Sequence, residues 1–247
     1  MSHVAAIICA AGSSSRFGGK KKKPFVDVAG RAAFLRSVEL FTDRTDVKQV
    51  LLAISPEDEE IVKIRWGENL SFFGVTICFG GKARFDTVAN ALKLVKDDID
   101  LVAVHDAARC CVTAELINRT IKAALISGAA IPACPVVPTL KIVSEGIISK
   151  TIDRQGLYEA QTPQIFDKSL LLKAYENLAT IDNNSIYVSD DAQLVELIHQ
   201  KVTVVQADSS NIKITHPNDV ALAEAILKTQ AQKTSEGPIN PYAEAHW

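Results

Sequence analysis

The first 25 residues constrain this chain more than any other segment. An apolar run from Val4 to Ala11 leads directly into Gly12-Ser-Ser-Ser-Arg16-Phe-Gly-Gly19, and the lysines Lys20 to Lys23 follow before Pro24. The run has the length and composition of a strand buried on both faces of a parallel sheet. Backbone N–H groups in a turn of small residues form a concave site for an anion, and positive charge follows at once. The segment therefore predicts a nucleoside triphosphate site at the end of a buried strand.

This loop differs from two common phosphate-binding motifs. A Walker loop needs the pattern G-x-x-x-x-G-K-[S/T], but the glycines that follow Gly12 are Gly18 and Gly19, so the spacing fails. The dinucleotide fingerprint G-x-G-x-x-G is also absent, because Ser14 occupies the place of its second glycine. The broken glycine pattern argues against a Rossmann dehydrogenase.

The length and charge of the chain limit its class. Its 247 residues suffice for one α/β domain, alone or with an excursion. A net charge of −2 argues against a nucleic-acid-binding protein, so the lysine cluster is a local feature. No apolar run reaches the ~18 residues that span a bilayer, so we expect no membrane association. No Lys or Arg precedes the first apolar run, which argues against a signal peptide.

The five cysteines are scattered and lack the spacing of a zinc site. Such a set indicates a reducing compartment. We therefore expect a cytoplasmic protein, or a plastid-stromal one if the source is plant-like.

Strand-like and helix-like segments alternate along the chain. We expect strands at residues 4–11, 49–55, 75–79, 101–105, 129–137 and 202–207. Between them, amphipathic or capped stretches predict helices at residues 33–42, 86–95, 113–127, 169–179, 191–200 and 216–233. This alternation predicts an α/β fold with a Rossmann-like three-layer α/β/α architecture, in which a mostly parallel sheet is covered on both faces.

One stretch interrupts the alternation. Between Pro135 and Thr162, two short β-prone pieces flank Ser144-Glu-Gly146, which is a hairpin signal. Two strands alone are marginal in water, so we expect this protruding arm, at about residues 135–160, to pack on a second subunit. Residues 1–233 then form a single domain that includes the arm. The tail at residues 234–247 lacks periodicity, and we expect it to be poorly ordered.

Polar side chains follow two of the predicted strands, where ligands of open α/β sheets bind. After the third strand, the pair Gly80-Gly81 permits close contact with a base, and Thr87 offers a hydroxyl group. After the fourth, Asp106 could bind Mg²⁺ or a substrate hydroxyl, and Arg109 could pair with Asp106 or with a phosphate. The structural alternatives are a plain strand-to-helix turn and an Asp–Arg pair near the surface. We expect His105 to be structural rather than a base.

Two later segments offer weaker candidates. Arg154 could reach an anionic substrate and Thr162 could donate to a phosphate, unless Thr162-Pro-Gln164 only starts the next helix. Ser189-Asp190-Asp191 marks either a helix start or a contact with a hydroxyl group.

Two lysines are candidates for phosphate contacts. The alternation in Asn211-Ile-Lys213-Ile points Asn211 and Lys213 to one face, so Lys213 can sit at a phosphate, although a lone lysine is more often a solvated charge. In the first cluster we choose Lys23, because Pro24 fixes the chain that follows it. Lys22 is a rival by residue type alone.

Taken in order, these pieces resemble the 2-C-methyl-D-erythritol 4-phosphate cytidylyltransferase family of the sugar-phosphate nucleotidyltransferase superfamily. The resemblance extends from Val4 to about Lys228. No single motif is decisive, but the ordered set is highly specific. The matching pieces are Ala10-Ala-Gly-Ser-Ser-Ser-Arg16, Lys23-Pro, Gly80-Gly-Lys-Ala-Arg-Phe-Asp-Thr87, His105-Asp-Ala-Ala-Arg109, Thr139, Asp153-Arg154, Gln161-Thr-Pro-Gln164, Ser189-Asp190 and Asn211-Ile-Lys213.

The resemblance implies a reaction and a site. Enzymes of this family transfer CMP from CTP to methylerythritol phosphate and release pyrophosphate with the help of Mg²⁺, in non-mevalonate isoprenoid synthesis. The implied nucleotide-binding residues are Ala10, Ala11, Gly12, Ser13, Ser14, Gly81, Thr87 and Ala107. The implied catalytic residues are Arg16, Lys23, Arg154 and Lys213. The implied acceptor-binding residues are Asp106, Arg109, Thr139, Thr162 and Ser189.

The resemblance also implies a homodimer and a candidate ligand for the metal ion. The arm at residues 135–160 resembles the dimerisation arm of the family, which places Arg154 and Thr139 in the active site of the partner subunit. Asp106 is the candidate metal ligand, unless the triphosphate itself holds most of the Mg²⁺.

Three positions depart from the family pattern. Cys110 stands where proline is usual, Lys82 where an acidic residue is frequent, and Ser189 where threonine is common. The first two put local geometry in doubt rather than the activity.

Two other functions remain open. A ribitol 5-phosphate cytidylyltransferase would share the fold and the chemistry, but Asp153-Arg154 before Gln161-Thr-Pro-Gln164 favours the methylerythritol acceptor. A nucleotide-binding regulator without catalysis would not need Arg16, Lys23, Asp106, Arg154 and Lys213 together.

Overall fold

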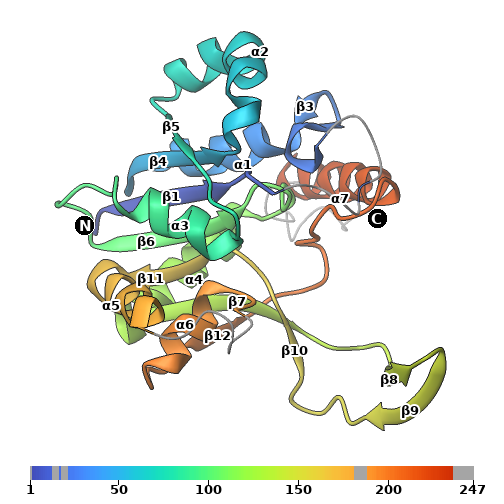
Figure 1. Cartoon of the computed structure of the whole chain (residues 1–247). Coiled ribbons are helices and arrows are strands. Elements are labelled where there is room, and N and C mark those ends of the chain that lie inside the picture. Colours follow the sequence, from blue (N-terminus) through green and yellow to red (C-terminus); the bar gives the residue numbers. More distant parts are fainter. Residues whose placement is uncertain (1, 13–16, 18–21, 181–187, 236–247) are drawn as a thin grey trace, which may run out of the picture.

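The structure is a computed structural model of the chain, and it describes residues 2–12, 17, 22–180 and 188–235. Within these residues one eight-stranded sheet forms the centre of the molecule (Figure 1). Seven strands lie in the order β10 (Tyr158–Ala160), β7 (Ala129–Pro135), β11 (Gln164–Asp167), β6 (Leu101–Asp106), β1 (Val4–Cys9), β4 (Val47–Ile54) and β5 (Thr76–Phe79). Strand β12 (Thr203–Gln206) pairs with β7 outside this path.

Most strands of this sheet run parallel. The pairs β1–β4, β1–β6, β4–β5 and β7–β12 are parallel, whereas β11 is antiparallel to both β6 and β7, and β10 is antiparallel to β7. The predicted α/β class with a mostly parallel sheet is confirmed.

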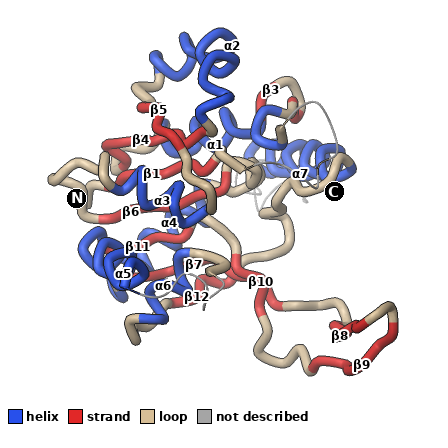
Figure 2. Tube along the Cα trace, in the orientation of Figure 1, coloured by secondary structure: helices blue, strands red, loops and turns tan. Residues whose placement is uncertain are grey.

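Helices cover both faces because the side chains of each central strand alternate between them. Ala6 and Ile8 of β1 pack on one face with helices α1 (Ala33–Thr42), α2 (Glu59–Phe72) and α4 (Ala114–Ser127). Ala5 and Ile7 pack on the other face with α3 (Arg84–Leu92), α5 (Lys168–Thr180) and α6 (Asp191–Leu197). Figure 2 shows these helices on the two sides of the strands. All four side chains are fully buried, so the first apolar run is the two-sided core strand that its composition predicts.

Helix α2 and strand β11 depart from the prediction. The sequence pattern does not predict helix α2, because this helix buries only Val62 and Leu70, whereas Ile64 and Phe72 are 76% and 85% exposed. Its apolar residues therefore do not mark one helical face. The alternative that Thr162-Pro-Gln164 starts a helix is wrong, since residues 164–167 form β11 and helix α5 begins at Lys168.

The predicted hairpin arm is present and stands apart from the main sheet. Strands β8 (Leu140–Ser144) and β9 (Ile147–Ile152) pair only with each other among the described strands, and they extend away from the sheet in Figure 1. Glu145 and Gly146 have φ angles of 52° and 81°, as a two-residue type I′ turn requires. Ile147 and Ile148 are 73% and 59% exposed.

The C-terminal helix α7 (Asn218–Ser235) packs beside the carboxyl end of β6. Ile214 and Ala223 form a third apolar cluster with Val28, Cys110 and Cys111. The short strands β2 (Asp27–Val28) and β3 (Arg31–Ala32) pair at its edge. Residues 234 and 235 end this helix, and the rest of the predicted tail lies outside the described residues.

Among the residues that the structure describes, no helix combines the length and the apolarity that spanning a bilayer requires.

Candidate active site

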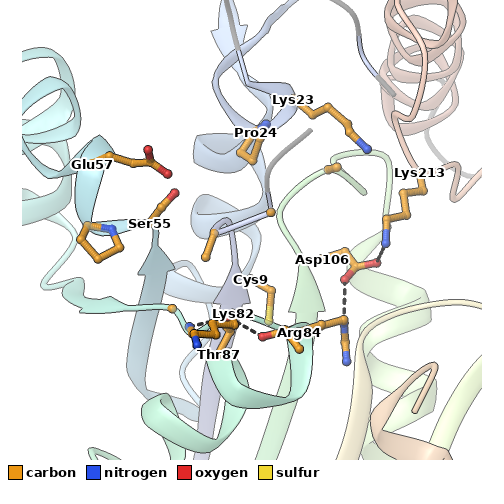
Figure 3. A pocket seen from close by; sticks show the side chains of 17 residues that line it. Cys9, Lys23, Pro24, Ser55, Glu57, Lys82, Arg84, Thr87, Asp106 and Lys213 are labelled. Carbon is orange, nitrogen blue, oxygen red and sulfur yellow. Dashed lines mark hydrogen bonds and ion pairs between the residues drawn. The ribbon is translucent and has the colours of Figure 1, made fainter. Parts of the chain in front are cut away.

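A cleft of about 660 Å³ opens at the carboxyl ends of four neighbouring strands, β5, β4, β1 and β6. This is the edge at which ligands of open α/β sheets bind. Each strand end supplies part of the lining, and three residues from other segments complete it (Figure 3). The lining consists of Cys9, Ala11 and Gly12 at β1, residues 55–57 after β4, residues 80–84 and Thr87 after β5, Asp106 and Ala108 at β6, and Lys23, Pro24 and Lys213.

The glycine pair brings two loops of the cleft unusually close together. A Cβ atom at Gly80 would lie 2.3 Å from the Cβ of Ala11, and one at Gly81 would lie 2.2 Å from the Cβ of Asp86. Larger residues are therefore excluded at both positions. The Thr87 hydroxyl accepts a hydrogen bond from the Gly81 N–H at 3.1 Å and donates to the Ala83 carbonyl at 3.1 Å. Thr87 thus fixes the shape of the loop between β5 and α3.

Asp106 lies among three cationic side chains. Its Oδ2 accepts a hydrogen bond from Lys213 Nζ at 2.6 Å and lies 3.7 Å from Arg109 Nε, while its Oδ1 lies 3.4 Å from Arg84 Nε. Burial alone would raise the pKa of this carboxyl group, but the charges of Lys213, Arg84 and Arg109 hold that pKa far below its usual range. Asp106 is therefore ionised at neutral pH.

As a metal ligand, Asp106 fits poorly. Its two oxygens already face cations, which would repel a divalent ion. In the part of the chain that the structure describes, no group of three or more His, Cys, Asp or Glu side chains could hold a metal. That the nucleotide itself carries most of the cation stays a prediction.

A second network lies beside Asp106, and the sequence does not reveal it. The Arg84 guanidinium bridges two carboxylates, because Nη1 also donates to Asp191 Oδ2 at 2.6 Å. The Tyr175 hydroxyl donates to Asp191 Oδ1 at 2.5 Å. Arg84 belongs to the predicted base-binding segment, but its partner lies 107 positions further along the chain. Residue spacing carries no signal for such a pair.

Thr162 and His105 lie behind Asp106 rather than on the cleft. The Thr162 hydroxyl accepts from the Asp106 N–H at 3.1 Å and donates to His105 Nδ1 at 3.0 Å. His105 Nε2 donates to the Arg109 carbonyl at 3.2 Å, which assigns the ring proton to Nε2. Complete burial lowers the pKa of His105 to about 4, so the ring is neutral at pH 7. These contacts agree with the structural role expected for His105.

Arg109 is similarly held by its surroundings. Its Nη1 donates to the Asn211 carbonyl at 2.7 Å, and its Nη2 donates to the Ala160 carbonyl at 3.2 Å. Arg109 therefore pairs with Asp106, and its other donors tie the loop after β6 to two neighbouring segments. The alternative contact of Arg109 with a phosphate stays a prediction.

The two rival lysines have different surroundings. Lys22 Nζ donates to Ser55 Oγ at 2.9 Å and to Asp58 Oδ2 at 2.8 Å, and it also contacts Glu57. Lys22 therefore ties the chain after the first loop to the start of α2. Lys23 lines the cleft, and Figure 3 shows it on the same side as Lys213.

The remaining predicted residues that belong to the described ranges do not line this cleft. Ala10 and Ala107 are fully buried next to it, and Ser189 donates to Gln193 Oε1 at the start of α6. Thr139 and Arg154 belong to the exposed arm, where Arg154 donates to the Val137 carbonyl. Ser13, Ser14 and Arg16 lie outside the described residues.

Comparison with known proteins gives one consistent answer. The family model for 2-C-methyl-D-erythritol 4-phosphate cytidylyltransferase matches residues 4–229. The chain is 40% identical over 226 residues to the enzyme of that name from Endomicrobium trichonymphae, covering 91% of this chain and 99% of the relative. It is 36% identical over 224 residues to the enzyme of that name from Clostridioides difficile, covering 91% and 93%.

A solved structure agrees with these relatives. The crystal structure of the 2-C-methyl-D-erythritol 4-phosphate cytidylyltransferase from Thermus thermophilus is similar with a TM-score of 0.76 and 32% identity, covering 92% of this chain and 99% of that one. Because the match to the family extends over most of the chain, the protein belongs to the 2-C-methyl-D-erythritol 4-phosphate cytidylyltransferase family.

Proposed function

We propose that this protein transfers CMP from CTP to 2-C-methyl-D-erythritol 4-phosphate, giving 4-diphosphocytidyl-2-C-methyl-D-erythritol and pyrophosphate. The observation that carries the proposal is the convergence of Lys23, Lys213 and ionised Asp106 with a close-packed glycine loop in one cleft, in a chain of this family. A volume of about 660 Å³ lies in the usual range for small-molecule sites.

The reaction requires little covalent chemistry from the protein. An oxygen of the acceptor phosphate attacks the α-phosphorus of CTP, the bond to the β-phosphate bridging oxygen breaks, and pyrophosphate leaves with the electron pair. The acceptor is already an anion at neutral pH, so the barrier is its repulsion by the triphosphate. Lys23, Lys213 and Arg16 are the residues that we propose to offset this repulsion and to stabilise charge at the α-phosphate.

The nucleotide side of the site is formed by backbone and small side chains. We propose that residues 10–14, Gly81, Thr87 and Ala107 enclose the triphosphate and the base. The close contact of Gly80 with Ala11 supports this assignment, since it joins the two loops in the lining of one cleft. CTP enters as its Mg²⁺ complex.

The acceptor side is centred on Asp106. Its ionised carboxylate can accept hydrogen bonds from acceptor hydroxyls, while Arg109 and Thr162 hold the loop that carries it. We assign Ser189 to the same side.

We further propose a homodimer. The arm would supply Arg154 and Thr139 to the site of a second copy, and its exposed isoleucines support an interface. In this proposal residues 1–233 act as one domain. The five free thiols fit a reducing compartment, for which we propose the cytoplasm.

The test is pyrophosphate release with CTP and Mg²⁺, comparing methylerythritol 4-phosphate with ribitol 5-phosphate. Rapid release with methylerythritol phosphate and CTP alone is the expected result. Release with ribitol phosphate alone would keep the chemistry but replace the acceptor. A folded protein that binds CTP and releases nothing with either acceptor would be a regulatory nucleotide-binding protein.

A further inference from the structure

Arg84 occupies a position between the two sides of the proposed site. It is the first residue of α3, directly after the glycine loop that packs on Ala11. Its guanidinium reaches in the other direction to Asp106, which faces Lys213 (Figure 3). The Arg84 side chain therefore links two parts of the site. One is the loop that we propose to hold the base, and the other is the carboxylate that we propose to hold the acceptor.

The guanidinium of Arg84 is also held by a second carboxylate, that of Asp191. Asp191, at the start of α6, has a side chain that is only 1% exposed, and it contacts Arg84 at 2.6 Å. The Tyr175 hydroxyl, from α5, donates to the second oxygen of the same carboxylate. Two helices on one face of the sheet thus fix the guanidinium in place.

We propose that Arg84 is a positioning residue, which orients the Asp106 carboxylate toward Lys213 and so prepares the acceptor side of the site. Asp191 and Tyr175 act through Arg84, as the support that fixes its side chain. The inference rests on the proposed function, because the acceptor is identified there.

The planar shape of the guanidinium explains why arginine is required. Its donors point in fixed directions, so Nε and Nη1 can serve two different carboxylates at once. A lysine has one compact ammonium group, which would pair with the more buried Asp191 and leave Asp106 Oδ1 without this contact. Arg84→Lys therefore keeps the charge and removes the bridge.

The experiment measures KM for each substrate separately in Arg84→Lys. Because a misplaced Asp106 carboxylate would bind the acceptor hydroxyls less well, we expect KM for the acceptor to rise about tenfold or more and KM for CTP to change less than about threefold. Tyr175→Phe keeps both charges and should raise the acceptor KM by about two- to fivefold, through looser support of Arg84.

Arg44→Lys is the matched control. Arg44 also makes a two-point contact with one carboxylate, Asp46, at 2.9 and 2.7 Å, but it lies outside the cleft. Any loss of stability from replacing a bidentate arginine should appear in both variants, whereas the change in acceptor KM should appear only at position 84. An unchanged acceptor KM in Arg84→Lys, or an equal rise for both substrates, would overturn the proposal.

A crystal structure of Arg84→Lys tests the positioning without turnover. We expect the Asp106 carboxylate to turn and its 2.6 Å contact with Lys213 to lengthen or split into two orientations. An undisturbed pair would overturn the inference. If the protein without any substitution releases no pyrophosphate with either acceptor, the proposed function is refuted instead. Failure of the positioning role and failure of the proposed function are therefore distinguishable.

Discussion

The neighbouring side chains of Lys22 and Lys23 lie in different surroundings, and the consequence of this difference can be measured. We expect Lys23→Ala to lower kcat by on the order of 10²–10³, since it removes a donor placed for the transition state. We expect Lys22→Ala to lower stability by about 1–3 kcal/mol, because Asp58 then loses a charged partner while largely buried.

The two variants serve as controls for each other, with turnover and urea unfolding measured on both. A Lys23→Ala enzyme with normal turnover would remove this lysine from the mechanism.

His105 gives the protein a predictable response to acid. Its pKa is about 4 when folded, through burial, and about 6.5 when unfolded. Between these values the unfolded chain binds more protons, so stability falls as pH falls through this window. We expect a loss of about 2 kcal/mol from this group between pH 7 and pH 5.

Urea unfolding of the unchanged protein and of His105→Gln at both pH values isolates this contribution. The variant should lose less stability on acidification, whatever its stability at pH 7. Equal losses in the two proteins would show that His105 does not titrate in this way.

The individual residues of the cleft are predictable from the sequence where they follow a buried strand. Gly12, Gly81 and Asp106 line the cleft because each lies at or just after a strand end, whereas Lys213 reaches it from the irregular segment before α7. Asp191 is visible in the sequence only as part of a helix start, because its pairing with Arg84 depends on how α3 and α6 approach in three dimensions.

The close packing of two loops at the carboxyl edge of the sheet can be tested by a substitution at Gly80. In Gly80→Ala the new Cβ would meet the Cβ of Ala11 at 2.3 Å, so one of the two loops must move. We expect KM for CTP to rise about tenfold or more, as a displacement of about 1 Å can cause.

Gly67→Ala in α2 is the control for this substitution. A Cβ there would have no atom within 4 Å, and the position is helical, so we expect a gain of about 0.5–1 kcal/mol in stability with unchanged kinetics. Steady-state kinetics and thermal unfolding, measured on both variants, test these expectations. Normal CTP binding in Gly80→Ala would show that this loop contact does not shape the nucleotide site.

Elements are predictable when one physical signal dominates. The continuous apolar run makes β1 evident, and the turn chemistry of Glu145-Gly146 makes the hairpin evident. Strand β11 escapes prediction because four residues are too few to show a period, and its place between β6 and β7 is set by long-range pairing. Helix α2 escapes it because its apolar residues do not mark one face.

The proposed exchange of arms between two subunits can be tested with mixed dimers. If each arm completes the site of a second copy, Lys23→Ala and Arg154→Ala are each inactive alone. Mixed dimers, however, contain one site with both native residues. Equal mixing after exchange of subunits should therefore restore about a quarter of the unchanged activity, since half of the dimers are mixed and each has one of two sites intact.

Pyrophosphate release before and after mixing provides the measurement, with sedimentation to confirm the dimer. Mixing Lys23→Ala with Lys213→Ala is the control and should restore nothing, because both residues line the same cleft. Failure of the first pair to recover, in a protein shown to exchange subunits, would place Arg154 in its own subunit's site or outside both.

The attachment of the arm has a consequence for how this molecule can vary. Tyr158 of β10 lies directly opposite Pro135 of β7, so the sheet itself closes the gap from which residues 136–157 emerge. The entropy of closing a loop grows only with the logarithm of its length, so a longer or shorter arm changes the stability of the sheet little. The length of the arm can therefore change without moving the cleft, so the body that carries the cleft and the surface that the arm presents can diverge separately.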